Sequence, residues 1–167
     1  MKKVKFFVFL SVLAIFYTFS VSGQKTDFSG SWRIVREKST LTEFTPTLVR
    51  LNIEIKGDSL LTERVYEGGD GQEYPFNENV TLDGIEYSIT IYDMPRKAKA
   101  TWSEPDSALI VETTTTFNGD SGPEDFISKE TWKVDKENNT LVINYKNKLS
   151  AGESEGAFFF NKAEETK

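Results

Sequence analysis

The residues best suited to bind a ligand in this sequence are two charged side chains placed among apolar ones. Glu130 stands two positions before Trp132, and Arg64 stands between Thr62 and Tyr66 in a similar setting. In a strand, alternate side chains share one face, so both charges would point the same way as their apolar neighbours. A buried Glu–Arg pair of this kind could anchor a ligand, although charged groups rarely lie fully inside a protein.

Two residue types that carry much of enzyme chemistry are missing, because the chain has no histidine and no cysteine. Thiol catalysis and Ser-His-Asp triads are therefore excluded, and the usual zinc ligands are absent. The acidic turns at Asp70 and Asp120 lack the spacing of a calcium loop, and no two carboxylates stand out as a glycosidase pair. We expect no catalytic residues, no metal ion and no cofactor, and hence a protein that is not an enzyme.

The first 23 residues have the three-part layout of a secretory signal peptide. Lys2, Lys3 and Lys5 precede the apolar run Phe6–Phe19, and the small residues of Val21–Gly23 follow. The run is shorter than the roughly 20 apolar residues that span a bilayer. We expect cleavage after Gly23, no membrane span in the mature chain, and a periplasmic or extracellular location; an uncleaved anchor is the alternative.

The rest of the chain, residues 24–167, has the length of one domain. The whole sequence carries 20 basic and 26 acidic residues, and three of the lysines lie in the predicted leader. The mature chain would therefore have 17 basic and 26 acidic residues, a net charge of −9. Such a surface repels phosphate backbones, and no basic patch interrupts it, so we expect no nucleic-acid partner. The oligomeric state cannot be read from these patterns.

Short segments with period-two alternation, divided by turn residues, predict an all-β fold. Leu51, Ile53 and Ile55 alternate with polar residues, for example, and Asp83-Gly84 is the strongest hairpin signal in the chain. The predicted strands cover Ser31–Arg36, Leu48–Lys56, Leu60–Glu67, Gln72–Leu82, Ile85–Tyr92, Arg96–Ser103, Ser107–Phe117, Glu124–Val134, Thr140–Asn147 and Gly156–Lys162.

The connections between these segments favour a barrel over a sandwich. Nearly all are short enough for hairpins, and only Glu37–Thr47 and Asn147–Glu155 could cross a sheet. The first of them could hold one helical turn. We therefore predict an antiparallel up-and-down meander of about 8–10 strands that closes on itself and so removes its free edges.

The segment Asp27-Phe28-Ser29-Gly30-Ser31-Trp32 carries a family resemblance. A Gly-x-Trp on the first strand, just after a signal peptide, resembles the signature of lipocalins and their calycin relatives, and the whole chain resembles small exported lipocalin-like bacterial proteins. The resemblance implies a barrel like that of lipocalins and fatty-acid-binding proteins. Neither the helix that follows the lipocalin barrel nor the Arg-x-Tyr of the last strand in fatty-acid-binding proteins is found here.

If the barrel is hollow, its lining follows from the phase of the strands. The candidate cavity residues are Trp32, Arg64, Tyr87, Trp102, Thr113, Thr115, Glu130, Trp132 and Tyr145. Each tryptophan could equally belong to an ordinary core, and a bulge could turn the threonines toward water. The partly polar lining favours a small apolar or amphipathic ligand. The alternative is a filled barrel of the cell envelope whose loops, Glu67–Gln72 and Asn118–Glu124, contact other molecules.

Overall fold

The computed structural model describes residues 26–42, 46–104, 107–119 and 122–163, and the predicted leader lies outside these ranges. The strands are β1 Gly30–Ile34, β2 Thr47–Lys56, β3 Ser59–Glu67, β4 Glu73–Thr81, β5 Tyr87–Ile91, β6 Met94–Ser103, β7 Ala108–Gly119, β8 Gly122–Asp135, β9 Thr140–Leu149 and β10 Gly152–Lys162. One 3₁₀ turn, η1 Arg36–Lys38, follows β1 and overlaps the start of the connection Glu37–Thr47, where one helical turn was predicted. The described part of the chain has no helix long and apolar enough to cross a membrane.

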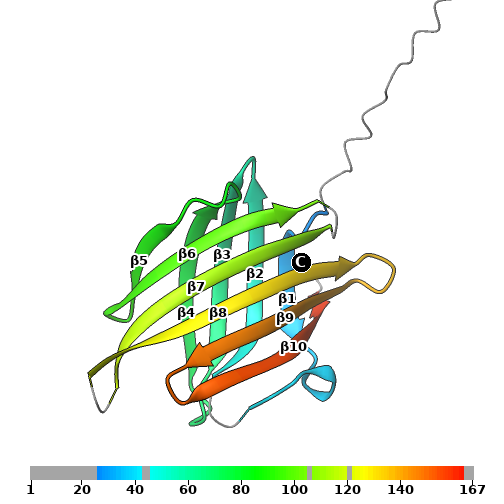
Figure 1. Ribbon diagram of the computed structural model, residues 1–167. Helices are drawn as coiled ribbons and strands as arrows, with labels where there is room; N and C mark the ends of the chain where they lie inside the picture. Colours follow the sequence, from blue (N-terminus) through cyan, green and yellow to red (C-terminus); the bar gives the residue numbers. More distant parts are fainter. Residues whose placement is uncertain (1–25, 43–45, 105–106, 120–121, 164–167) are drawn as a thin grey trace, which may run out of the picture.

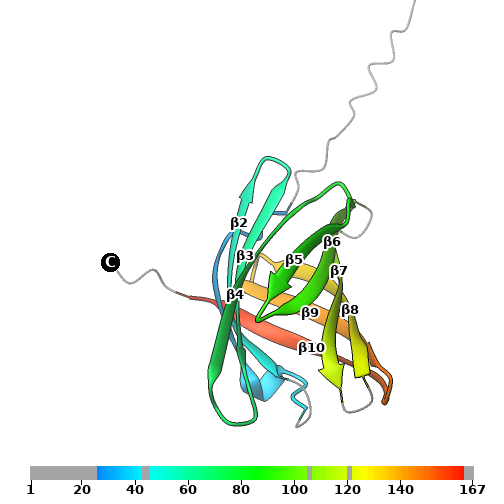
Figure 2. The same ribbon diagram turned by 90° about the vertical axis from the view of Figure 1, so that its left-hand side faces the viewer.

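The ten strands form one antiparallel sheet in the order β4-β3-β2-β1-β10-β9-β8-β7-β6-β5. Every pairing joins chain neighbours except that of β1 with β10, which brings the two ends of the domain together. The sheet curls so that β2–β4 lie across from β6–β9, as Figures 1 and 2 show. The predicted all-β antiparallel meander is confirmed, and the barrel that it forms is nearly closed.

The first and last strands in this order, β4 and β5, meet at a seam that no backbone pairing joins within the described ranges. Hydrogen bonds from side chains connect the two sides of the seam instead. The Tyr87 hydroxyl lies 2.9 Å from Thr81 Oγ1, and the Tyr92 hydroxyl donates to the carbonyl of Pro75 at 2.6 Å. The edges of β4 and β5 are therefore next to each other around the barrel without being hydrogen-bonded as strands (Figure 2).

The predicted hairpin at Asp83-Gly84 is wrong in its pairing. Asp83 forms an isolated bridge with Thr101 of β6, and the Gly84 N–H donates to the carbonyl of Ala100 at 2.9 Å. The Asp83 carboxylate also accepts a hydrogen bond from the Ile85 N–H, two residues further along the chain. Aspartate side chains form local turns of this kind with their own backbone. The chain therefore crosses the seam here and attaches to the far edge of the sheet instead of folding back on β4.

Two further boundaries differ from the prediction. The turn before β6 lies at Tyr92-Asp93, whose positive φ angles of 49° and 65° fit a tight hairpin, so β6 begins at Met94 and not at the predicted Arg96. The segment Asn147–Glu155 is a hairpin of β9 and β10, with Leu149 opposite Gly152, and not a crossing connection. Pro95 is tolerated in β6 because it pairs only with the short edge strand β5.

Aromatic side chains fill one end of the barrel, and the Gly-x-Trp segment lies there. The Trp32 indole N–H donates to the carbonyl of Phe28 at 2.9 Å, and both side chains are buried. Gly30 has a φ of +129°, and a Cβ on it would lie 2.7 Å from the side chain of Lys162, which passes over the Trp32 ring. A side chain at position 30 would displace this contact, which accounts for the glycine.

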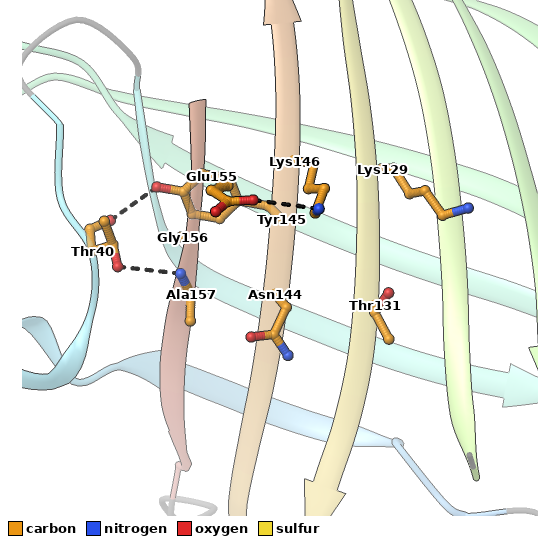
Figure 3. A pocket seen from close by; sticks show the side chains of 9 residues that line it. All are labelled: Thr40, Lys129, Thr131, Asn144, Tyr145, Lys146, Glu155, Gly156 and Ala157. Atoms are coloured by element: carbon orange, nitrogen blue, oxygen red, sulfur yellow. Dashed lines mark hydrogen bonds and ion pairs between the residues drawn. The ribbon is translucent and has the colours of Figure 1, made fainter. Parts of the chain in front are cut away.

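Gly156 in β10 makes room for a contact between Tyr145 of β9 and the segment that follows η1. Tyr145 lies opposite it on β9, and the Tyr145 hydroxyl reaches across to the carbonyl of Thr40 at 3.3 Å (Figure 3). Thr40 also pairs with the backbone of Ala157, so the segment after η1 lies along β10. A Cβ on Gly156 would lie 2.6 Å from both the Thr40 Cβ and the Tyr145 hydroxyl. Only glycine leaves room for this crossing.

We predict that Gly156→Ala destabilises the fold by about 1–3 kcal/mol, the usual cost of overpacking. The matched control is Gly69→Ala, because a Cβ there meets nothing within 4 Å. Chemical denaturation of the two variants measures the difference. Equal free energies of unfolding would show that the Tyr145–Thr40 crossing contributes nothing.

Candidate functional site: a lumen with a charged floor

The barrel is hollow at the end away from Trp32. A cavity of about 860 Å³ opens there between the two walls. Its lining combines aromatic and apolar side chains with a few polar ones. The lining residues are Pro46, Tyr66, Gly68, Gly69, Asp70, Tyr74, Phe76, Ile91, Tyr92, Met94, Arg96, Thr115, Phe117, Phe126, Ser128, Glu130, Tyr145, Asn147, Leu149 and Phe158. Few polar groups within a mostly apolar concavity are typical of small-molecule sites.

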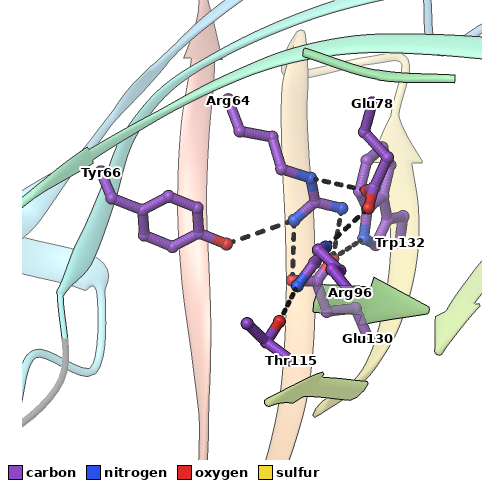
Figure 4. A network of polar contacts seen from close by, with 7 residues as sticks. All are labelled: Arg64, Tyr66, Glu78, Arg96, Thr115, Glu130 and Trp132. Atoms are coloured by element: carbon purple, nitrogen blue, oxygen red, sulfur yellow. Dashed lines mark hydrogen bonds and ion pairs between the residues drawn. The ribbon is translucent and has the colours of Figure 1, made fainter. Parts of the chain in front are cut away.

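The predicted pair of Arg64 and Glu130 exists and crosses the interior from β3 to β8 (Figure 4). Arg64 Nη1 and Nη2 donate to the two carboxylate oxygens of Glu130 at 2.9 and 3.0 Å, a bidentate geometry. The guanidinium lies 5.1 Å from the centre of the Trp132 ring, and the Trp132 indole N–H donates to Glu130 at 2.8 Å. Arg64 is 0% exposed and Glu130 is 8% exposed, so this contact excludes bulk water.

A second ion pair extends the same network toward the seam. Arg96 Nε of β6 donates to Glu78 Oε1 of β4 at 2.7 Å, and Arg96 Nη1 donates to Thr115 Oγ1 at 2.9 Å. The other carboxylate oxygen of Glu78 lies 3.5 Å from Arg64 Nε. Glu78 is 4% exposed and Arg96 is 7% exposed. Two guanidiniums and two carboxylates thus alternate across the floor of the cavity, and their formal charges cancel.

The network keeps the carboxylate of Glu78 ionised despite its burial. Burial alone would raise the pKa of Glu78, but the charges of Arg64 and Arg96 and the Arg96 hydrogen bond outweigh it and lower that pKa. Burial likewise opposes the charge on Arg64, yet the carboxylate of Glu130 raises the Arg64 pKa well above its ordinary value. Desolvation raises the pKa of the Tyr66 phenol, whose hydroxyl accepts from Arg64 at 3.3 Å and stays protonated.

The candidate residues predicted from the sequence divide into three groups. Thr115, Glu130 and Tyr145 line the cavity. Arg64 and Trp132 lie just beneath it in the polar network (Figure 4). The others do not line it: Trp32 and Trp102 pack in the aromatic end, Thr113 is buried in β7, and Tyr87 lies at the seam.

The inward phase predicted for Thr113 and Glu130 is confirmed, because both side chains are buried, and Ser128, which is in phase with Glu130, is buried as well. Glu78 is not among the residues predicted from the sequence, although its signal was present. Phe76, Glu78 and Val80 alternate in β4 in the same way as the residues around Glu130.

A second, smaller hollow lies on the outer face of β8, β9 and β10, beside Thr40 (Figure 3). Its volume is about 510 Å³, and the exposed Lys129 and Lys146 contribute to its lining. Lys146 and Glu155 pair with each other across it at 3.4 Å. These groups face water, where such pairs contribute little, so the interior cavity is the stronger candidate site.

Comparison of the chain with protein-family models, with curated proteins and with solved structures gave no match.

We predict that removing one partner of the central pair costs more stability than removing both. Arg64→Met or Glu130→Leu alone leaves a charge buried in the floor and should cost about 3–5 kcal/mol. The double variant keeps the neutral Glu78–Arg96 pair and should be more stable than either single variant. A double-mutant cycle by denaturant unfolding measures the coupling. Strictly additive losses would contradict a direct interaction between the two side chains.

Glu78 should make the protein sensitive to acid. Its folded-state pKa lies below its ordinary value of 4.5, so its charge stabilises the folded state above that pH, and the stabilisation is lost as the pH falls through the folded-state pKa. Glu78→Gln should lower stability at neutral pH and flatten the decline below about pH 4.5. Thermal unfolding across this pH range measures how steeply stability falls with pH. If stability falls as steeply in the variant as in the unaltered protein, Glu78 is not the source of the acid sensitivity.

Proposed function

We propose that this protein binds a small amphipathic molecule in the lumen of its barrel, as an exported protein that acts outside the cytoplasm. The observation that carries the proposal is the cavity of about 860 Å³, which lies within the roughly 300–1,000 Å³ typical of ligand sites. Burial of apolar ligand surface against Phe117, Phe126 and Phe158 would supply affinity. No covalent step is involved, and the protein is a binding module rather than an enzyme.

The lining supports an amphipathic ligand over a purely apolar one. The aromatic walls lie toward the mouth, whereas the floor presents Arg96, Thr115 and Glu130. A ligand without polar atoms would cover these groups without hydrogen-bonding them, which costs free energy. The polar part of the ligand would therefore lie deep in the lumen and the apolar part near the opening.

Two features of the sequence complete the proposal. The leader of residues 1–23 supports export, and the segment Asp27–Trp32 at the start of a ten-strand meander supports a lipocalin-like relationship. The alternative, a barrel filled by its own side chains that works through its loops, is disfavoured by the volume left open between the walls.

Two variants on β8 test the proposal. Ser128→Phe places a ring inside the lumen, whereas Ile127→Phe adds one on the outer face, where Ile127 is 44% exposed. Ser128→Phe should weaken binding of the neutral dye Nile red by on the order of ten-fold, and Ile127→Phe should leave it unchanged.

The measurement is dye fluorescence on folded protein, with circular dichroism as the check on folding. Native mass spectrometry of protein purified from its own host should in addition show a co-purified amphipathic molecule. A bare mass, together with no saturable dye binding by the unaltered protein, would favour the filled-barrel alternative.

A further inference from the structure

We propose that the lumen selects ligands with an uncharged, hydrogen-bonding head group, such as an alcohol, over carboxylates or amines that carry the same apolar chain. The inference rests on the proposed function and names the ligand class of that same cavity. Three features carry it: a charge-balanced floor, which disfavours both ions, an acidic mouth, which disfavours carboxylates, and neutral polar groups on neighbouring strands.

The floor offers no unbalanced charge to an ionic head group. Arg64 is held in a bidentate pair by Glu130, and Arg96 is held by Glu78 at 2.7 Å. A ligand carboxylate that entered would lose its hydration and would meet the carboxylate of Glu130, which lines the cavity. A ligand ammonium would in the same way meet Arg96. Either ion would leave the buried site with a net charge, which is costly in a dry interior.

The mouth of the cavity also opposes anions. Asp70 lines it, and its carboxylate accepts the N–H of Gln72 at 3.0 Å and the hydroxyl of Tyr74 at 3.1 Å. The Gln72 hydrogen bond, together with that from Tyr74, lowers the pKa of Asp70, so this group is ionised at neutral pH. Because Arg64 balances Glu130 in the floor, Asp70 is the negative charge that an incoming carboxylate meets at the mouth.

Neutral polar groups meet on the inner face of β8 and β9. Ser128 and Asn147 are directly opposite each other in the sheet, and both line the cavity. The side-chain oxygen of Asn147 is buried and has no hydrogen-bond partner within the described structure. A buried acceptor of this kind is costly unless a donor reaches it, and a ligand hydroxyl can donate to Asn147 while accepting from Ser128. A carboxylate has no proton to donate to this oxygen.

The test compares three ligands of equal chain length: decanol, decanoate and decylamine. Their affinities for the unaltered protein are measured at about pH 8, where the acid and the amine are both charged, by displacement of Nile red and by calorimetry. Decanol should bind at least about ten-fold more tightly than either ion. Tighter or equal binding of decanoate or decylamine would overturn the inference and leave the proposed function standing. Failure of all three ligands and of the dye to bind would overturn both.

A matched pair of variants on β9 locates the selectivity. Asn147→Leu removes the amide whose oxygen is buried, whereas Asn144→Leu changes an exposed residue on the opposite face of the same strand. Asn147→Leu should weaken decanol binding by on the order of ten-fold and leave the weak binding of decanoate nearly unchanged. Asn144→Leu should alter neither. An equal loss for decanol and decanoate in Asn147→Leu would show that the amide acts only through packing.

Discussion

Four buried charges that alternate across the lumen hold the two walls of this barrel together. The sheet has two edges, β4 and β5, that no strand pairing joins within the described chain, so contacts between side chains must complete the closure. Glu78 reaches from β4 to Arg96 of β6, and Arg64 reaches from β3 to Glu130 of β8. Such pairs add little net stability compared with apolar packing, but any other arrangement of the walls would leave a buried charge without its partner. Their contribution is therefore to specify one closed form.

The same network divides the interior into two parts with different roles. On one side, Trp32, Trp132 and Phe160 pack with aliphatic residues into a conventional core. On the other side, smaller polar residues such as Thr115 and Ser128 replace large apolar ones, and a cavity remains. The packed end supplies the hydrophobic stabilisation that a domain without disulfides needs, so the other end can remain hollow. The packed core and the proposed binding cavity thus lie at opposite ends of one barrel.

The charged floor gives the lumen its chemical character. A cavity with only aromatic walls would accept any apolar molecule of suitable size, whereas buried polar groups reject ligands that leave them unpaired. Because the guanidiniums and carboxylates balance one another in charge, the floor does not require an ionic ligand. Among the residues that line the described cavity, Asn147 has a buried side-chain oxygen without a hydrogen-bond partner. In the proposed function, the polarity of the ligand head is therefore the property that this arrangement distinguishes best.

The sequence by itself determined the strands, the class of fold, and the inward phase of Arg64 and Glu130, because alternation and turn residues are local signals. It misassigned Asp83-Gly84, since a hairpin signal cannot show that the chain crosses a seam instead of pairing. Only the tertiary structure decided that Arg64 meets Glu130, 66 positions along the chain, that Glu78 joins them, and where the cavity lies. Phase fixes which face a side chain occupies, whereas its height and its position around the barrel depend on the register of all ten strands.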